Sequence, residues 1–207
     1  MPRNAEQNSK TKEERRQRIL AGALELFARN GLAGTKISDI ARKTGMSNGL
    51  VYHYFPAKED IFIELIRVAF ERLSEACQWL RDAPMTPGHK IATAITELVK
   101  TLRTSPDACL YHLLVAQAAT SECIPPEAKE IFGACRREPY EVIAEILAQG
   151  QEAGVIRQGP PEDLAFFFWN TINGLAVHHA MYGQEARTPC LEPFYAMLFT
   201  NTGDTHD

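Results

Sequence analysis

This 207-residue chain lacks long hydrophobic runs and paired cysteines. No apolar stretch approaches the roughly 18 residues of a membrane-spanning helix, and the polar residues 1–12 do not contain the apolar segment of a secretory signal. The five cysteines are scattered without disulfide or metal-ligand spacing, which favours reduced thiols. We therefore expect a cytoplasmic protein that neither spans a membrane nor depends on disulfides.

Catalytic and metal-binding signatures are also missing. The sequence contains no GxSxG, HExxH, P-loop or dinucleotide-binding fingerprint, and its cysteines have no evident base partner. His178, His179 and Cys190 suggest a metal sensor, but adjacent helical residues diverge by about 100° and no CxxC or HxxxH spacing occurs. We therefore expect that the protein is not an enzyme and has no catalytic residue, no cofactor and no metal site. A metal-responsive protein is the alternative.

Charge is distributed unevenly along the sequence, whose net charge is −4. Residues 1–58 hold 11 Lys and Arg against 5 Asp and Glu, a surplus of six positive charges. The other 149 residues hold 11 against 21, a surplus of ten negative charges. A basic N-terminal quarter is typical of a surface that attracts phosphate, although a solvated basic tail explains the charge equally well.

Helical periodicity dominates the chain, and there is no sustained alternation of apolar and polar residues typical of strands. Thr11 opens a capping box, and Asn30-Gly31 supplies a C-terminal stop. Pro139 lies inside an apolar helical pattern and predicts a kink or a break there. The sequence therefore predicts an all-α fold of about nine helices, at residues 11–30, 37–44, 48–54, 58–80, 87–103, 107–120, 125–153, 161–182 and 190–200.

The most specific pattern lies at residues 35–58, TKISDIARKTGMSNGLVYHYFPAK. A helix of about eight residues, a turn containing Gly45 and a second short helix form the pattern of a DNA-binding helix-turn-helix. A generic helical bundle is the plainer alternative. We expect Ser47 to cap the second helix, Lys58 to reach a phosphate and Phe55 to belong to the core.

A longer motif surrounds this segment and covers about the first 65 residues. It reads Arg18-Ile-Leu-x-x-Ala23-x-x-Leu26-Phe27-x-x-x-Gly31, then Thr35, Ile40-Ala41 and Gly45-x-Ser47-x-Gly49-x-x-Tyr52-x-Tyr54-Phe55-x-x-Lys58. This motif resembles the tetracycline-repressor (TetR) family of bacterial transcription regulators. The resemblance implies a homodimeric, mostly repressing regulator that binds a palindromic, double-stranded operator. The DNA contacts that it implies fall on Thr35, Ser47, Asn48, Gly49, Tyr52, His53, Tyr54 and Lys58.

Two residues depart from the family pattern. Tyr54 stands where many members have histidine, so a phenol would take the place of an imidazole at a phosphate. Lys36 occupies a position often held by threonine or serine, which leaves open how helix 37–44 is capped. Neither departure changes the expected helix-turn-helix.

We expect three regions: a flexible basic arm at residues 1–10, the helix-turn-helix domain at 11–58, and a larger helical domain at 59–207 that binds an effector and forms the dimer. Helix 161–182 is apolar nearly all round, so it must be buried on two sides. By resemblance, this helix and the last one pack against their twofold copies. The interface residues assigned on that basis are Phe168, Leu175, His178, Tyr182, Phe194 and Leu198.

The larger domain also contains candidates for an interior effector pocket. Aromatic side chains mixed with isolated Asn, Gln and His suit a small, mainly apolar organic ligand held by a few hydrogen bonds. The candidates are Trp79, Cys109, His112, Leu113, Gln117, Tyr140, Phe167, Asn170 and Asn173. The acidic character of this domain favours a cationic ligand, or it serves solubility alone. The predicted function is a ligand-released repressor, and a body that binds a protein partner is the alternative.

Overall fold

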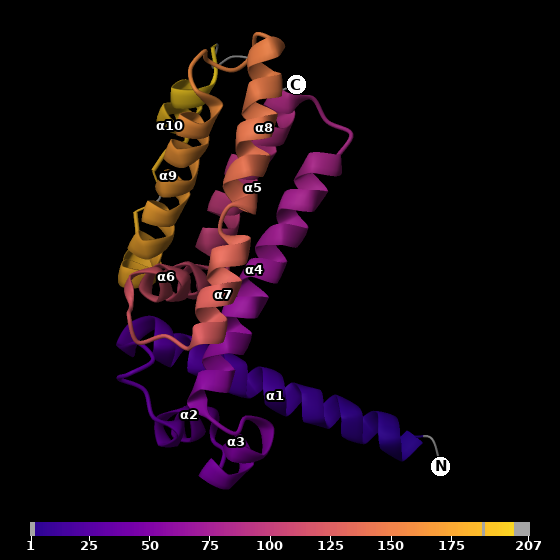
Figure 1. The fold of residues 1–207 in the computed structure, drawn as a ribbon, viewed down its shortest axis with the longest axis vertical. Helices are drawn as coiled ribbons and strands as arrows, with labels where there is room; N and C mark the ends of the chain where they lie inside the picture. Colours follow the sequence, from indigo (N-terminus) through magenta and orange to yellow (C-terminus); the bar gives the residue numbers. More distant parts are fainter. Residues whose placement is uncertain (1–2, 188, 201–207) are drawn as a thin grey trace. The chain divides into compact units, whose positions relative to one another are not determined.

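The structure is a computed structural model that describes residues 3–187 and 189–200. Within these ranges the chain forms ten α-helices, one short 3-10 helix at Gly183–Glu185 and no strand (Figure 1). The helices are α1 (Arg3–Asn30), α2 (Ile37–Thr44), α3 (Asn48–Tyr54), α4 (Lys58–Asp82), α5 (Pro87–Thr104), α6 (Pro106–Thr120), α7 (Pro126–Cys135), α8 (Glu138–Glu152), α9 (Pro161–Tyr182) and α10 (Glu192–Leu198). The predicted all-α class is confirmed.

The start of α1 differs from the expectation, whereas the break near Pro139 agrees with it. The first helix begins at Arg3 and not at Thr11, because no glycine or proline separates the capping-box residues from the helix-compatible residues before them. Residues 3–10 of the expected flexible arm are therefore helical, and residues 1–2 lie outside the described ranges. The stretch around Pro139 is divided as predicted, with Pro139 in the first turn of α8, where no backbone N–H is needed.

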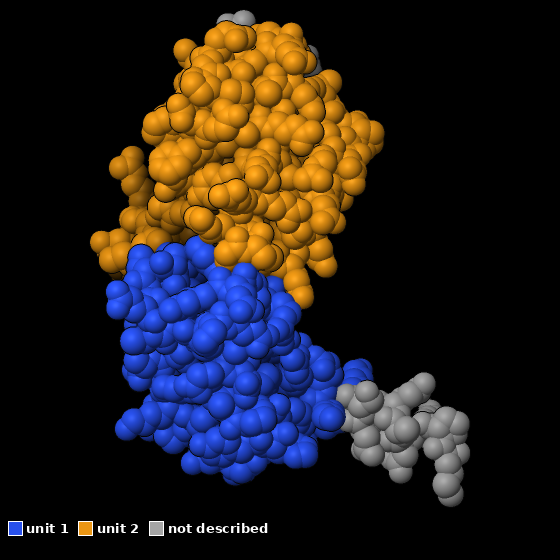
Figure 2. Space-filling model, viewed as in Figure 1, with its two compact units in different colours: residues 1–69, 113–132 blue, residues 70–112, 133–207 orange. Residues whose placement is uncertain are grey.

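The chain divides into two compact units (Figure 2). Unit 1 consists of residues 1–69 and 113–132, and unit 2 consists of residues 70–112 and 133–207. The expected boundary at residues 58/59 is thus displaced into α4, and unit 1 recruits a second segment from far along the chain. The periodicity of apolar residues in one helix does not indicate where that helix leaves one core and enters another. The predicted domain boundary therefore fell at the start of α4.

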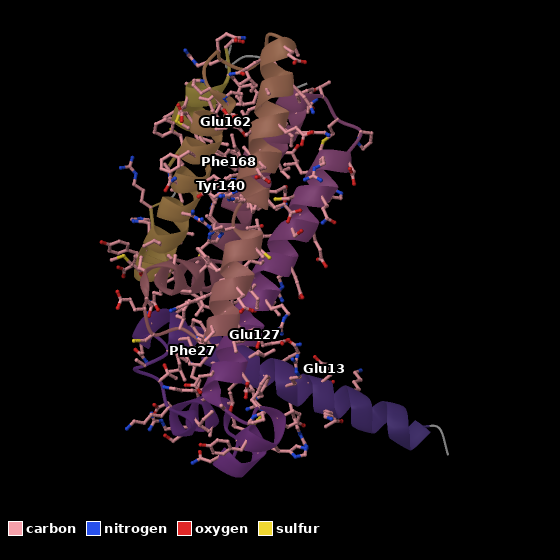
Figure 3. The ribbon with its side chains drawn as sticks, viewed as in Figure 1. Glu13, Phe27, Glu127, Tyr140, Glu162 and Phe168 are labelled. Atoms are coloured by element: carbon pink, nitrogen blue, oxygen red, sulfur yellow. The ribbon has the colours of Figure 1, made fainter. Side chains whose placement is uncertain are left out.

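Unit 1 has a core built around the apolar face of α1. Phe27, labelled in Figure 3, is fully buried, and its ring meets that of Phe62 edge-on with 5.6 Å between centroids. Leu114 and Ala128, from the second segment of the unit, are also fully buried. Because these residues are supplied by the segment 113–132, the helix-turn-helix region shares one core with parts of α6 and α7.

The C-terminal end of α1 receives a hydrogen bond from this second segment. The Gln117 side-chain amide donates to the carbonyl of Ala28 with 2.6 Å between Nε2 and O. The last four carbonyls of an α-helix have no partner within the helix, so this bond satisfies one of them. Gln117 therefore fixes the end of α1 to α6.

In unit 2, α5, α8 and α9 pack against one another, and α8 and α9 run side by side (Figure 1). Phe168 and Trp169 of α9 are buried, and the Trp169 indole N–H donates to the carbonyl of Pro139 at 2.9 Å. A Cβ at Gly150 of α8 would overlap the side chain of the buried Ile156, so a glycine permits that close approach. No helix within the described ranges is both long and apolar enough to cross a membrane.

Candidate nucleic-acid interface

The turn between α2 and α3 depends on one glycine. Gly45 follows α2 with φ = 66°, a left-handed conformation that is readily adopted only by residues without a Cβ. The N–H of Met46 then donates to the carbonyl of Ala41 at 2.9 Å, which closes the end of α2. The turn predicted at Gly45 is confirmed, and it separates the two helices of a helix-turn-helix.

The start of α2 is capped by a residue that the sequence analysis missed. The Asp39 carboxylate accepts the backbone N–H of Lys36 at 3.2 Å, and its other oxygen accepts from the Arg42 guanidinium at 2.8 Å. A carboxylate at the third helical position can satisfy the N–H of the cap residue when that residue has no oxygen of its own. Asp39 thus completes the cap of α2 that the sequence left open at Lys36. A carboxylate three residues after Lys36 was the signal in the sequence that could have predicted this cap.

The start of α3 is capped by Ser47, as predicted. Its hydroxyl oxygen accepts the backbone N–H of Leu50 at 3.2 Å. Val51 is fully buried and Phe55 nearly so, which confirms that Phe55 belongs to the core. A capped start and two buried apolar residues together hold α3 in one orientation on unit 1.

The opposite side of α3 is open to solvent. Asn48, Gly49, Tyr52 and His53 are exposed, and 52% of Tyr52 is accessible although it is a large aromatic residue. Tyr54 is half-buried, and its ring meets that of His53 edge-on at 5.4 Å. Amide, imidazole and phenol groups offer both donors and acceptors, which is what the edges of bases in the major groove require.

Two of the expected DNA contacts are turned toward the protein. Thr35 has no exposed surface, and its hydroxyl donates to the carbonyl of Gly31 at 2.9 Å, so it is not available to DNA in this structure. The Lys58 ammonium donates to the carbonyls of Leu32 and Thr35 at 2.7 and 2.9 Å. An ammonium has three N–H donors, so one remains for a phosphate. Both side chains hold the loop between α1 and α2.

Among the effector candidates, His112 and Asn173 lie together in unit 2. His112 Nδ1 and Asn173 Oδ1 are 2.9 Å apart. Burial lowers the pKa of His112, and the hydrogen bond to the Asn173 side-chain oxygen opposes that shift only in part. Tyr140 lies elsewhere in the same unit, and burial raises its pKa. The structure thus places one polar pair and one phenol in partly buried positions of unit 2.

Other effector candidates occupy different places. Trp79 and Phe167 are 60% and 54% exposed, so the expectation that they face an interior pocket is wrong for this chain, and Asn170 is exposed as well. Their helices carry apolar residues on several faces, so the sequence did not distinguish inner from outer positions. Gln117 belongs to unit 1 together with Leu113. The remaining candidate, Cys109, is buried, and its thiol donates to the carbonyl of Leu102 at 3.1 Å.

The residues assigned to a dimer interface require a correction. Phe168, Phe194 and Leu198 are buried inside unit 2, where the rings of Phe168 and Phe194 are 5.6 Å apart. Leu175 and His178 are half-buried, and Tyr182 is exposed. The large apolar side chains that α9 exposes are a partly different set, near its two ends, which we call the α9 outer face: Phe166, Phe167, Met181 and Tyr182.

The histidine pair near the end of α9 does not form a metal cluster. His178 Nε2 accepts the backbone N–H of Arg187 at 3.2 Å, and its ring lies 4.7 Å from that of Tyr182. Across residues 3–187 and 189–200 no three His, Cys, Asp or Glu side chains gather as metal ligands. The contacts of His178 are therefore those of a packed side chain at a helix end.

An all-helical chain that presents the second helix of a helix-turn-helix from a basic N-terminal region is a DNA-binding regulator of transcription. Residues 19–65 match the model for bacterial regulatory proteins of the tetR family. Residues 19–65 thus match the DNA-binding region of this family, as the motif in the first 65 residues predicted.

Relatives with curated names are regulators as well. The transcriptional repressor AcnR of Corynebacterium diphtheriae is 33% identical over 99 residues, which are 44% of this chain and about half (52%) of AcnR. The fatty acid metabolism regulator protein of Bacillus subtilis is 25% identical over 72% of this chain and 75% of its own. Both names agree with the class defined by the fold and by α3.

Solved structures share the fold over most of the chain. The MbdR regulator from Azoarcus sp. CIB aligns with a TM-score of 0.74 and 24% identity over 87% of this chain and 94% of its own. A transcriptional regulator from Saccharomonospora viridis, solved in complex with choline, aligns with a TM-score of 0.61 and 26% identity, covering 84% and 89%. The all-α fold of this chain is therefore shared with known regulators.

Proposed function

We propose that the protein is a homodimeric repressor that binds a palindromic operator through α3 and releases it when a small effector binds unit 2. The observation that carries the proposal is the exposed face of α3. That face presents Asn48, Tyr52 and His53 on a helix whose start is capped and whose other side is buried. A rigid helix bearing polar groups is suited to the major groove, and the positive surplus of residues 1–58 favours contact with phosphates.

The dimer is proposed to form through the α9 outer face. Phe166, Phe167, Met181 and Tyr182 are each more than half exposed, and they lie on one helix. Exposed large apolar side chains are typical of an interface, and a twofold dimer buries the same residues from both copies. Such a dimer would also supply two recognition helices for half-sites about 34–36 Å apart.

The effector is proposed to act through α6. This helix carries His112 in unit 2 and Gln117 in unit 1, where Gln117 holds the end of α1. A ligand that binds one position of α6 better than another would shift the population of α1 orientations and thereby that of α3. Proteins that share this fold have been solved with small molecules, among them choline, isovaleryl coenzyme A and triclosan.

Operator binding is tested by selecting bound fragments from genomic DNA and measuring their affinity by fluorescence anisotropy. Tyr52→Ala should weaken binding to the selected operator by about 1–3 kcal/mol, because it removes a side chain from the reading face. Trp79→Ala, which removes another exposed aromatic residue, from unit 2, is the matched control. Wild-type affinity of Tyr52→Ala would refute the proposed role of α3.

The proposed dimer is tested by sedimentation velocity. Phe167→Asp should convert dimers to monomers, because each copy would then bury a carboxylate in the interface. Trp79→Asp places the same charge on an exposed aromatic position outside the α9 outer face. A Phe167→Asp protein that still sediments as a dimer would rule out this face.

A further inference from the structure

Most of the basic side chains described in unit 1 already have a partner within the protein. Five of them form ion pairs with carboxylates at 2.6–3.8 Å: Arg16, Arg29, Arg42, Lys43 and Arg67. Two more donate to backbone carbonyls: Lys58 and Lys129. A cation held by a carboxylate attracts a phosphate less strongly, because its charge is already compensated. The positive surplus of residues 1–58 is therefore not spread evenly over the surface of unit 1.

The uncompensated basic side chains gather in one stretch of α1. Lys10, Lys12, Arg15 and Arg18 are exposed, and none of them forms an ion pair with a carboxylate of the described residues. Lys36, before the start of α2, is the one further basic residue of unit 1 in this state where the structure describes the side chains. The free positive charge of unit 1 thus lies mainly between residues 10 and 18.

The acidic residues of the same stretch do not neutralise it. Glu13 accepts a hydrogen bond from the Gln17 side-chain amide at 2.7 Å. Glu14 lies one helical turn before Arg18, but no ion pair joins the two among the described residues. Residues 10–18 hold five basic and two acidic side chains, which leaves a surplus of three positive charges.

This basic stretch adjoins the turn of the helix-turn-helix. Arg15, Arg18 and Gly22 share one side of α1, because they are three and four residues apart. At Gly22 this side lies against α2, since a Cβ there would be 2.5 Å from the Thr44 methyl carbon. One turn earlier, a Cβ at Gly45 would be 3.3 Å from Nη2 of Arg18. The Arg18 guanidinium therefore lies at the turn that leads into α3, and α1 continues past α2 and α3 toward its N-terminal end (Figure 1).

Phosphates are the chemical groups that this position suits. A helix that enters the major groove, which is about 12 Å wide, has a phosphate backbone along each side. A guanidinium at the turn before such a helix lies next to one of these backbones, and its planar fork of donors matches two phosphate oxygens. The family match begins at residue 19, so it does not cover Arg15 or Arg18.

We propose that Arg15 and Arg18 bind phosphates of the operator beside the groove that α3 enters, so that α1 is a second DNA-binding element. The inference rests on the proposed function, because it takes α3 as the helix that enters the groove. Lys10 and Lys12 extend the positive surface along α1, and Lys10 lies about 12 Å from Arg18 along the helix axis. The sequence showed the positive surplus but not which of its cations are free.

The test is a salt titration of DNA binding by the full chain, followed by fluorescence anisotropy. The double variant Arg15→Gln with Arg18→Gln should lower the slope of log affinity against log salt by about 0.9 for each lost contact, or about 1.8 for each bound copy. At roughly 0.15 M salt, each lost contact should weaken binding about fivefold. A scrambled duplex of the same length should lose affinity by a similar factor, because phosphate contacts carry no sequence information. An unchanged slope in the double variant would overturn the proposal.

Two controls separate phosphate binding from other effects of these arginines. Arg15→Lys with Arg18→Lys keeps both charges and should keep the salt slope. If this variant loses the slope as fully as the glutamine variant, the arginines act by holding the turn at Gly45, and the inference is wrong. Arg136→Gln removes an exposed arginine of unit 2 that has no ion pair among the described residues, and it should leave the slope unchanged. An equal loss for each charge removed there would assign the effect to net charge alone and refute the site on α1.

Comparison with Tyr52→Ala separates this inference from the proposed function. Tyr52→Ala should reduce discrimination between the operator and the scrambled duplex, whereas the glutamine variant should weaken both duplexes alike. If Tyr52→Ala weakens operator binding but the glutamine variant keeps the wild-type slope, the inference fails and the proposed function remains. If the glutamine variant lowers the slope but Tyr52→Ala binds as the wild type does, α1 stands as a DNA-binding element and the role of α3 fails.

Discussion

Replacing Lys58 by methionine removes an ammonium that two backbone carbonyls share. Its Nζ lies 2.7 Å from the Leu32 oxygen and 2.9 Å from the Thr35 oxygen. A hydrogen bond from a charged donor contributes about 1.5–3 kcal/mol, and because this side chain is only partly buried we take the lower end for the pair. We therefore expect Lys58→Met to lower the free energy of unfolding of unit 1 by about 2 kcal/mol. Methionine keeps a similar unbranched stem, so the loss reports the ammonium.

The assay is urea denaturation followed by circular dichroism, with hydrogen exchange measured by mass spectrometry to localise the change. Exchange should accelerate in the loop between α1 and α2. Lys100→Met is the matched control, because the Lys100 side chain is 63% exposed and pairs with Glu97 across one helical turn, an interaction that contributes about 0.5 kcal/mol or less. If Lys58→Met is as stable as Lys100→Met, the bonds to the carbonyls do not hold the loop.

DNA binding separates the two roles of Lys58. If its third N–H also reaches a phosphate, Lys58→Met lowers the slope of log affinity against log salt by about 1. An unchanged slope in a destabilised protein assigns Lys58 to the loop alone. The measurement is a salt titration of operator binding at a temperature where both proteins are folded.

Three other predictions concern a cap, a close contact and a titration. Ser47→Ala should lower the free energy of unfolding by about 1 kcal/mol in urea denaturation, because it removes the cap of α3, and an unchanged midpoint would contradict this. Gly150→Ala should destabilise by about 1 kcal/mol net, as overlap with Ile156 outweighs improved helix propensity, whereas Gly133→Ala, with open space around it, should not. Burial lowers the pKa of His112 below its ordinary 6.5, so the unfolded chain takes up a proton that the folded chain resists and stability falls as the pH drops below about 6.5. In His112→Gln the free energy of unfolding should fall less steeply between pH 6.5 and 5. An equally steep fall would show that His112 does not cause this loss of stability.

Local signals in the sequence predicted most of the helices, together with the turn and the cap of the helix-turn-helix. The turn at Gly45, the cap at Ser47 and the break near Pro139 each follow from the conformational preference of one residue, so no tertiary contact was needed to locate them. The exposed residues of α3 follow from the same reasoning, because Val51 and Phe55 occupy its inner side.

Features that depend on tertiary packing were not predictable in the same way. Helix α9 is apolar nearly all round, so its periodicity did not show that Phe168 faces inward and Phe167 outward. The inward position of Thr35 and the bonds of Lys58 depend on a loop whose path no local pattern specifies.

The divided composition of unit 1 has a consequence for how the protein is made. Residues 1–69 contain the whole helix-turn-helix, yet Leu114 and Ala128, both fully buried, reach that core from the segment 113–132. A ribosome delivers the chain from its N-terminus, so the core of unit 1 stays incomplete until residue 132 has emerged. By that time residues 70–112 have also been synthesised, and the segment that controls DNA recognition matures together with the α6 helix proposed to regulate it.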